Sequence, residues 1–568
     1  MKRFGTIAVV LFVFVLSIAT SAYAQGFDIL FKNGRVYDGS GNPWFRADIA
    51  IKDSMIVGIG SFQNFTAKTV IDIDGLYISP GFIDIHSHAL DPASSGQGLD
   101  SEVRGRREAP NLVSQGITTV IVNQDGRSAN SPISEQIEQL HKAGIGVNAG
   151  LMIGHNSIRR QALGDDYHRS STRQEIEWMQ EKVREAMEQG SFGLSAGLEY
   201  VPGRWSDTEE VIALVNEITP FGGVYISHQR SEAKTPMLWL PSDGTPTPPT
   251  LLDAVEETIE IGRVTGATVV ASHLKSRGAN YWGGSTAAIS LIERARNNGV
   301  QIYADQYPYN TSGSDGNTIL LPSWVFNFED FGIEEAEPPN YKRPLAEVLL
   351  DPSLRQKLNK DIKHSITYRG GAERIVVFEF PDAALIGKSL AEIANDLKLS
   401  DEEVVIHLQN TGFSNRRGGA RLRSFSMHED DLNAIGATDW TATTTDGMIT
   451  LPEDGNDIHA RFYGTFPRKI FKYALTNGTI SVAHAVRSST SLPAQIMNIR
   501  NRGSIRVGNY ADLVVFDLYT LKDEATFFNP HQHSSGIKYV LVNGVPAISE
   551  GELTGTLNGR VLTPATSR

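Results

Sequence analysis

Apolar strand-like segments alternate with longer helical segments through the middle of this 568-residue chain. Helix candidates such as 172–189 and 251–265 lie between short, almost wholly apolar runs. Repeated strand-then-helix units predict an α/β fold, and this number of units predicts a TIM-like (β/α)8 barrel, in which functional side chains gather at the carboxyl ends of the strands. The strand candidates are 81–84, 118–122, 146–149, 193–195, 224–227, 268–272, 301–305 and 441–445, and the other helix candidates are 207–218 and 285–298.

Both ends of the chain are rich in short strand-like runs. In residues 25–79, such runs are separated by turn signals that include Asn33-Gly34 and Asp38-Gly39. Residues 501–568 contain two further strand candidates, 511–517 and 539–544. Two β-rich ends around a long middle predict one small β-sandwich domain that is formed by both chain ends.

The barrel is predicted in two parts, 80–324 and 436–500. Between them, residues 325–435 break the strand–helix rhythm with charged helical stretches, among them the lysine-rich segment 354–364. We therefore expect an inserted subdomain at 325–435.

The N-terminal residues have the pattern of a signal peptide. Lys2 and Arg3 precede an apolar stretch at 6–20, and Ala22-Tyr23-Ala24 supplies a small-x-small cleavage site. The apolar stretch is short for a membrane span. We expect residues 1–24 to be removed, and a periplasmic or secreted protein with no stable membrane insertion afterwards; an uncleaved N-terminal anchor is the alternative.

Charge and cysteine content narrow the possible functions. The formal net charge is -13, and no run of basic residues interleaved with aromatics offsets it, which argues against a nucleic-acid partner. The chain has no cysteine. Disulfides and thiolate metal ligands are therefore excluded, and any metal must be held by His, Asp, Glu or a modified Lys.

Metal-competent side chains follow five of the candidate strands. His86-Ser87-His88 comes directly after a strand, and alternation along an extended chain places both imidazoles on the same side. Taken singly, a histidine at a strand end is more often structural, and an aspartate before glycine is more often part of a turn. Recurrence at five strand ends instead predicts one metal centre. The residues at the other four strand ends are Asp125, His228, His273 and Asp446.

Residues 80–88, Pro-Gly-Phe-Ile-Asp-Ile-His-Ser-His, are similar to the opening signature of the amidohydrolase superfamily. Further motifs occur at residues 116–120, 195–200, 227–232, 272–275, 304–309, 464–468, 508–516 and 529–532. Together they resemble the N-acyl-D-amino-acid deacylase (D-aminoacylase) family of that superfamily. This narrower resemblance extends over nearly all of the chain that follows the predicted signal peptide.

The resemblance implies a metal-dependent hydrolase barrel with a β-sandwich, and a set of metal ligands. His228, His273 and Asp125 are the positions expected to hold one tight Zn²⁺ ion. His86 and His88 are the positions expected to serve a second, weaker metal site.

The resemblance also implies a substrate and the residues that act on it. Asp446 matches the general acid and base of the family. Lys275, Tyr307 and Arg461 match the positions expected to bind the carboxylate of a small N-acyl amino acid. Hydrolysis of the amide of an N-acyl-D-amino acid is the implied reaction, and the preference for the D form comes from the family alone.

The chain departs from the family pattern at the expected metal site. Where the family typically has Asn-Cys-Gly, this chain has Gln124-Asp125-Gly126. A carboxylate is a harder ligand than a thiolate, although zinc accepts both. We therefore expect the site to be kept, with a metal preference that can extend to Mn²⁺ or Co²⁺. A second departure is Ala460, where the family often has proline.

Two other functions are alternatives to hydrolysis of N-acyl amino acids. A dipeptidase or a cyclic-amide hydrolase of the same superfamily would usually recruit a carboxylated lysine as bridging ligand, and no lysine closes a candidate strand at the corresponding point. A non-catalytic binding protein would need neither Asp446 nor a complete ligand set. The sequence does not specify an oligomeric state.

Overall fold

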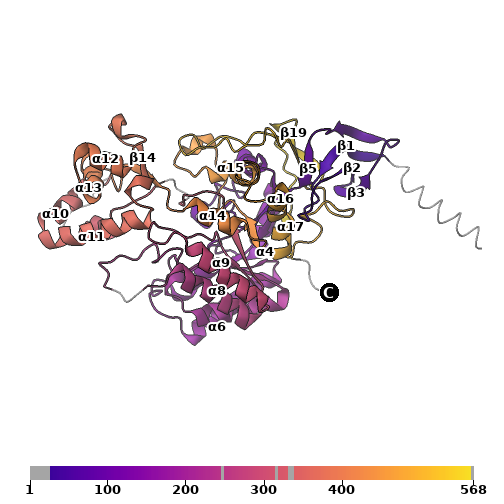
Figure 1. Ribbon diagram of the computed structural model, residues 1–568. Helices are drawn as coiled ribbons and strands as arrows, with labels where there is room; N and C mark the ends of the chain where they lie inside the picture. The colour runs from indigo at the N-terminus through magenta and orange to yellow at the C-terminus, as the bar shows by residue number, and fades with distance from the viewer. Residues whose placement is uncertain (1–25, 245–247, 314–316, 330–337, 565–568) are drawn as a thin grey trace, which may run out of the picture.

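The computed structural model describes residues 26–244, 248–313, 317–329 and 338–564, and Figure 1 gives the arrangement of its elements. The predicted signal peptide, residues 1–24, lies outside the described residues. In the part of the chain that the structure describes, no helix combines the length and apolar character that crossing a membrane requires.

Two parallel sheets form the centre of the molecule. One has the strand order β16-β13-β12-β11-β10-β9, and the other has the order β21-β8-β7-β6. An isolated parallel bridge joins Ser87, which follows β6, to Gly447, which follows β16. The strands are β6 (Phe82–Asp84), β7 (Ile117–Val122), β8 (Asn148–Leu151), β9 (Ile153–Gly154), β10 (Gly193–Gly197), β11 (Val224–His228), β12 (Thr268–Ala271), β13 (Ile302–Gln306), β16 (Thr441–Thr443) and β21 (Val561–Leu562).

Apart from β21, whose two residues are half-buried, these strands are almost wholly buried. Every residue of β7 and of β11 is buried, as expected for parallel strands that helices cover. The predicted strands therefore read as continuous apolar runs rather than as alternating ones. Their side chains join those of the covering helices in one large hydrophobic core.

The predicted helices are confirmed within one residue at each end. They are α6 (Arg173–Glu188), α7 (Thr208–Ile218), α8 (Leu251–Thr265) and α9 (Gly284–Asn297). Thr172 and Thr250 begin α6 and α8 with capping boxes, which satisfy amide groups that the first turn leaves free. Each of the four helices packs against the next, with α8 on β12 and α9 on β13.

The two chain ends share one sheet at one end of the molecule (Figure 1). Its order is β20-β19-β18-β17-β5-β1-β2-β3, and β4 pairs in parallel with β1 on the edge that also pairs with β5. Five strands come from the N-terminal region: β1 (Phe27–Val36), β2 (Phe45–Lys52), β3 (Met55–Gly60), β4 (Ala67–Asp72) and β5 (Tyr77–Pro80). Four come from the C-terminal region: β17 (Leu513–Phe516), β18 (Ile537–Val542), β19 (Val545–Ser549) and β20 (Glu552–Leu553).

One predicted turn in this sheet is wrong. The Asn33-Gly34 pair does not separate two strands, because β1 is continuous and absorbs the pair as an irregularity in its pairing with β2. Asn33 adopts a left-handed conformation, φ 64°, which asparagine tolerates better than most residues. Its backbone amide donates to Asp48 at 2.9 Å, so the irregularity is held by a side chain rather than by a hairpin turn.

Residues 342–424 form most of a group of elements with its own hydrophobic core, at the end of the molecule opposite the terminal sheet (Figure 1). Buried residues between Leu320 and Leu422 make up this core. The lysine-rich segment lies in α11, as its charged helical pattern predicts. The elements are α10 (Lys342–Leu350), α11 (Pro352–Tyr368), β14 (Ile375–Glu379), α12 (Leu390–Leu397), α13 (Asp401–Thr411) and β15 (Arg421–Ser424).

A buried polar network joins the terminal sheet to the central strands. Asp512, next to β17, forms an ion pair with Arg502 and accepts a hydrogen bond from the side chain of Asn148 on β8 at 3.1 Å. Asn543 donates its backbone amide to Asp512 at 2.6 Å and its side-chain amide to Asn148 at 2.8 Å. The network therefore ties β8 to the C-terminal part of the chain.

We predict that Asp512→Ala destabilises the protein strongly. The substitution leaves the buried Arg502 guanidinium without its carboxylate, which costs about 3–5 kcal/mol for a buried pair. Thermal denaturation should show a clearly lower melting temperature. Asp28→Ala is the control, because Asp28 pairs with the exposed Lys68 at the surface and should change the melting temperature little. Equal decreases in melting temperature for the two variants would contradict a stabilising role of the buried Asp512–Arg502 pair.

Candidate metal centre and active site

A cavity of about 430 Å³ opens at the carboxyl ends of the central strands. Eight of the nine predicted site residues line it, although they come from distant parts of the sequence. The ninth, His86, is completely buried behind the cavity wall and contacts Asp125. The eight are His88, Asp125, His228, His273, Lys275, Tyr307, Asp446 and Arg461.

The Asp125 carboxylate lies among four imidazoles. Its Oδ1 atom is 3.2 Å from Nε2 of His86, 3.7 Å from Nδ1 of His228 and 3.7 Å from Nε2 of His273. Its Oδ2 atom is 3.6 Å from Nε2 of His88. Ligand atoms of these residues form two overlapping groups, each compact enough to hold a metal ion, and Asp125 belongs to both.

The backbone bends sharply at three of these residues. Asp125, His273 and Asp446 have φ angles of 56°, 32° and 46°. Residues other than glycine rarely adopt such left-handed conformations, which cost on the order of 1–3 kcal/mol each and collect at functional sites. Each of these residues lies two or three positions after the end of its strand, and all three line the cavity.

Asp84 fixes the ends of two strands on either side of the site. Its carboxylate accepts hydrogen bonds from the hydroxyl groups of Thr444 and Thr445, and from the backbone amide of His86 at 3.2 Å. Burial raises the pKa of Asp84 to about 6, although the threonine hydrogen bonds oppose this rise. Asp84 thus holds the backbone of His86 next to the segment that carries Asp446.

Each imidazole is oriented by a partner on the ring nitrogen that faces away from Asp125. The Nδ1 atom of His86 is 2.9 Å from the Ser272 hydroxyl, and Nδ1 of His88 is 2.8 Å from Asp91. Such partners fix the tautomer and the ring orientation of a metal-binding histidine. The other two partners are Glu199, 3.1 Å from Nε2 of His228, and Glu232, 2.8 Å from Nδ1 of His273.

These partners were not predicted from the sequence. Glu199 and Glu232 lie within motifs that carry the family resemblance, and Asp91 lies three residues after His88. Their one sequence signal is a carboxylate within a few residues of a strand end, which loops commonly show. Only the fold shows which imidazole each carboxylate contacts.

Three buried atoms that face the centre are left without hydrogen-bond partners among the described residues. They are Nε2 of His86, Oδ1 of Asp125 and Nδ1 of His228. Buried polar atoms without partners are costly and therefore rare in folded proteins. Imidazole nitrogens and a carboxylate oxygen are zinc ligands, so the residues present fit a divalent metal ion.

The charges of the site favour a cation. Burial opposes charge on His228, but Glu232 and Asp125 outweigh burial and raise the pKa of His228 to about 10. Burial also opposes charge on Asp125, yet His86 and His228 hold the pKa of its carboxyl well below the ordinary value. Carboxylates thus surround the imidazoles on both sides, and this environment attracts positive charge.

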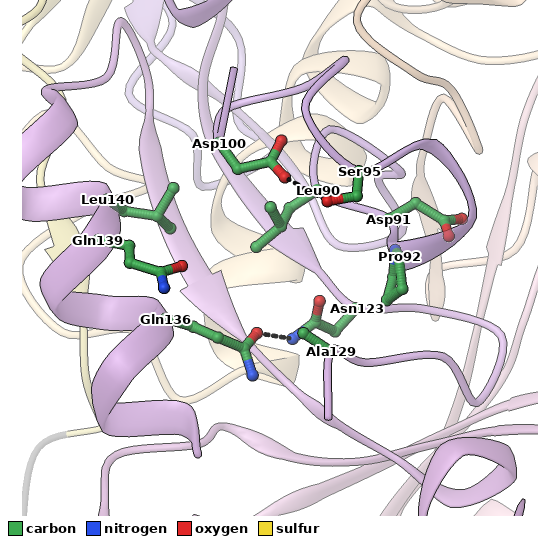
Figure 2. Close-up of a pocket in the computed structure, with 10 residues that line it drawn as sticks. All are labelled: Leu90, Asp91, Pro92, Ser95, Asp100, Asn123, Ala129, Gln136, Gln139 and Leu140. Atoms are coloured by element: carbon green, nitrogen blue, oxygen red, sulfur yellow. Dashed lines mark hydrogen bonds between the residues drawn. The ribbon is translucent and has the colours of Figure 1, made fainter. Parts of the chain in front are cut away.

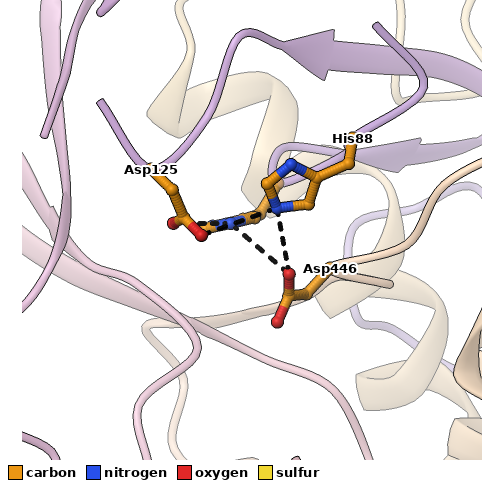
Figure 3. A group of neighbouring side chains, drawn as sticks. His88, Asp125 and Asp446 are labelled. Carbon is orange, nitrogen blue, oxygen red and sulfur yellow. Dashed lines mark ion pairs between the residues drawn. The ribbon is translucent and has the colours of Figure 1, made fainter. Parts of the chain in front are cut away.

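Asp446 lines the cavity, and its carboxylate lies next to the His88 ring (Figure 3). Its Oδ1 atom is 3.2 Å from Nε2 of His88, and its Oδ2 atom is 2.9 Å from the guanidinium of Arg461. Arg461 begins α15 (Arg461–Arg468) and also donates to the backbone carbonyl of Asp446 at 2.8 Å. Burial opposes charge on Asp446, but Arg461 and His88 lower the pKa of its carboxyl below the ordinary value.

The predicted carboxylate-binding residues meet at the wall of the cavity. The Arg461 guanidinium lies 4.4 Å from the centre of the Tyr307 ring, and Nζ of Lys275 lies 5.4 Å from it. Lys275 already forms an ion pair with Glu232 and contacts Nδ1 of His273 at 2.8 Å. Arg461 differs, because its buried Nη1 group has no hydrogen-bond partner among the described residues.

A second cavity lies beside the first, and Asp91 lines both (Figure 2). Its volume is about 90 Å³, too small for an N-acyl amino acid. Two leucines, Leu90 and Leu140, contribute to its lining. The cavity of about 430 Å³ that contains the buried His and Asp groups is the candidate active site.

Comparison with known proteins gives matches over nearly the whole chain. A model of the amidohydrolase family matches residues 401–548. A D-aminoacylase from Alcaligenes xylosoxydans xylosoxydans is 31% identical over 561 residues, which cover 95% of this chain and 98% of the relative.

Two solved structures align with the chain over most of its length. A structure of D-aminoacylase, from work on the role of its binuclear metal centre, aligns at 30% identity with a TM-score of 0.70, covering 94% of this chain and 100% of the other. N-acyl-D-glutamate deacylase from Bordetella bronchiseptica, in complex with zinc and a phosphonate that mimics the tetrahedral intermediate, aligns at 27% identity with a TM-score of 0.71. That alignment covers 95% of this chain and 100% of the other.

The fold and the buried His/Asp centre define an enzyme of the metal-dependent hydrolase class. The chain belongs to the D-aminoacylase family of the amidohydrolases. The resemblance that the sequence motifs carry is therefore confirmed.

We predict that His228→Ala weakens zinc binding by more than about 100-fold. Loss of a partner of a ligand typically lowers metal affinity 10–100-fold, and loss of a ligand should lower it further. Competition with a chromophoric chelator measures the affinity. His141→Ala is the control, because His141 lies exposed on α4 (Ile133–Ala143). Unchanged zinc affinity in His228→Ala would exclude His228 as a ligand.

Proposed function

We propose that this protein hydrolyses the amide bond of N-acyl-D-amino acids and releases a carboxylate and a free amino acid. The observation that carries the proposal is the buried Asp125 among four imidazoles, with the Asp446–Arg461 pair beside it in one cavity. The substrate class is that of the related deacylases, which act on N-acyl-D-amino acids by name.

The proposed architecture is a TIM-like (β/α)8 barrel with a small β-sandwich and an inserted subdomain. The parallel orders of the two central sheets support it, because β8 and β9 are consecutive in the chain and the Ser87–Gly447 bridge connects the outermost strands. The shared core of the terminal sheet supports the sandwich, and the separate core between Leu320 and Leu422 supports the insertion.

Asp125, His228 and His273 would hold one tight zinc ion, and His86 and His88 would serve a second, weaker position. When bound, such an ion polarises a carbonyl group and lowers the pKa of water towards about 7. Asp125 can serve both positions, because Oδ1 faces three imidazoles and Oδ2 faces His88.

Asp446 is the proposed general base and general acid. It lies at the cavity surface, 3.2 Å from His88 and therefore next to the metal positions. Arg461 and His88 keep its carboxylate ionised, so that it can accept a proton from the attacking water. The same carboxyl group would then deliver the proton to the nitrogen of the departing amine, which would otherwise leave as an unstable anion.

The carboxylate of the amino acid would bind Arg461. Its Nη1 group has no hydrogen-bond partner among the described residues and is the proposed donor to that carboxylate, whereas Nε and Nη2 are already engaged by Asp446. The Tyr307 ring packs against the Arg461 guanidinium. Lys275 lines the same cavity, with its ammonium group paired to Glu232. Binding at this end places the amide of the substrate towards Asp125 and Asp446.

The alternatives considered from the sequence are less well supported. In a dipeptidase or cyclic-amide hydrolase, a carboxylated lysine would bridge the ions, whereas here Asp125 already lies between all four imidazoles. A non-catalytic binding protein would not require a carboxylate such as Asp446 between the metal positions and the cavity.

We also propose that the protein works outside the cytoplasm, in the periplasm or after secretion. The positively charged start, the apolar stretch at 6–20 and the Ala22-Tyr23-Ala24 pattern support this location.

We predict that Asp446→Asn lowers kcat by about 10²–10⁴-fold on N-acetyl-D-amino acids, because the amide cannot transfer the proton. The zinc-loaded protein should be assayed against N-acetyl-D- and N-acetyl-L-amino acids and against the corresponding carboxamides. The wild type should hydrolyse the D-carboxylates best, since a guanidinium binds a carboxylate more strongly than an uncharged carboxamide.

Asp439→Asn is the matched control, because Asp439 is exposed two residues before β16. It should retain wild-type kcat. Full turnover in Asp446→Asn would remove Asp446 from the mechanism, and equal hydrolysis of carboxylates and carboxamides would contradict the proposed role of Arg461.

We predict that Asp125→Cys shifts metal selection towards zinc and away from manganese. A thiolate is a softer ligand than a carboxylate, and Mn²⁺ prefers oxygen ligands. Both proteins should be loaded from an equimolar mixture of Zn²⁺ and Mn²⁺, and the bound metals measured by mass spectrometry. The zinc-to-manganese ratio should be higher in the variant, and an unchanged ratio would show that Asp125 does not set the preference.

A further inference from the structure

Arg277 lies buried between the two glutamates that contact the metal-binding imidazoles. It follows β12 in the chain, and its side chain is 4% exposed. Its Nη1 atom is 3.2 Å from Oε2 of Glu232, and its Nη2 atom is 3.4 Å from Oε2 of Glu199. A single guanidinium therefore spans two carboxylates that come from the ends of two other strands, β10 and β11.

The two glutamates in turn contact two of the imidazoles. Oε2 of Glu199, the oxygen that faces Arg277, is also 3.1 Å from Nε2 of His228. The two carboxylate oxygens of Glu232 have different partners. Oε1 is 2.8 Å from Nδ1 of His273, and Oε2 faces Arg277. The opposite ring nitrogens, Nδ1 of His228 and Nε2 of His273, face Asp125.

Arg277 also contacts the segment between the two parts of the predicted barrel. One of its guanidinium nitrogens donates to the hydroxyl group of Tyr368 at the end of α11, and the guanidinium lies 4.6 Å from the centre of that ring. The backbone of Arg277 forms bridges to Ala233 and to Met427. Its position is thus fixed from several sides, by main chain as well as by side chains.

We propose that Arg277 is a positioning residue that clamps Glu199 and Glu232, and through them sets the orientation of His228 and His273 for metal binding. The proposal rests on the metal centre of the proposed function. It further assigns Tyr368 the role of holding the guanidinium in place, so that α11 supports the metal site although no residue of α11 is a ligand.

The charges of this cluster explain why an arginine is suited to the position. Glu199 and Glu232 are both buried, and two buried carboxylates without compensation would repel each other. Lys275 neutralises one charge of the pair by contacting Glu232. Arg277 supplies the second positive charge and reaches both carboxylates at once, whereas the single ammonium of a lysine lacks the planar fork.

The test compares zinc affinity in the full chain after metal removal and titration with a chromophoric chelator as competitor. Arg277→Gln should weaken zinc binding by about 10–100-fold, the range for partners of metal ligands. Arg277→Lys should retain part of the affinity, because it keeps the charge but reaches one glutamate at a time. Tyr368→Phe should weaken binding by less than about tenfold, because it removes only the hydroxyl group.

Arg502→Gln is the matched control. Arg502 is another buried arginine, 3% exposed and paired with Asp512, but it lies in the network beside the terminal sheet. This variant should melt at a lower temperature and yet bind zinc with wild-type affinity. Such a result separates loss of a positioning contact from general destabilisation.

Wild-type zinc affinity in both Arg277→Lys and Tyr368→Phe would overturn the proposal, even if Arg277→Gln failed to fold. The same would follow if Arg502→Gln weakened zinc binding as much as Arg277→Gln. Failure of the metal centre itself would look different, because His228→Ala would then bind zinc as tightly as the wild type. The outcomes for the clamp and for the metal centre are therefore distinguishable.

Discussion

The rest of the site depends on the placement of one buried carboxylate, Asp125, among four imidazoles. In water such a group would gain little from its neighbours, but inside the protein the low dielectric strengthens each contact and makes each unpaired atom costly. Atoms of His86, Asp125 and His228 nevertheless remain without hydrogen-bond partners in the described part of the chain. A divalent cation is the partner that would satisfy them together.

The fold serves this arrangement by bringing strand ends together and by holding them rigidly. Asp125, His273 and Asp446 adopt left-handed conformations directly after their strands, which a stable framework must support. Part of that support is electrostatic. Asp84 holds the segments that carry His86 and Asp446, while Arg277 links the carboxylates behind His228 and His273.

Much of the site could be predicted from the sequence, because the residues that face the metal positions come directly after apolar strands. The helices α6 to α9 could be predicted for a similar reason, since long helical segments with capping residues have local signals. The continuity of β1 could not, because a turn-forming Asn33-Gly34 pair is accommodated by pairing with a distant strand.

The contacts among the side chains that support the metal ligands could not be predicted from the sequence. Glu199, Glu232 and Arg277 are ordinary polar residues in loops, and their contacts join segments that are far apart in the chain. The ion pairs of Lys275 and Arg461 are a second example. Both residues were predicted to bind the substrate carboxylate. In the structure both are paired, Lys275 with Glu232 and Arg461 with Asp446, but Arg461 keeps one buried Nη1 group without a hydrogen-bond partner among the described residues.

The most direct test of the account is a crystal structure of the zinc-loaded protein with diffraction data collected on both sides of the zinc absorption edge. The account predicts an anomalous peak about 2.0–2.2 Å from Asp125, from Nδ1 of His228 and from Nε2 of His273. An anomalous map without a peak among these three residues, in crystals that contain zinc elsewhere, would contradict the central claim.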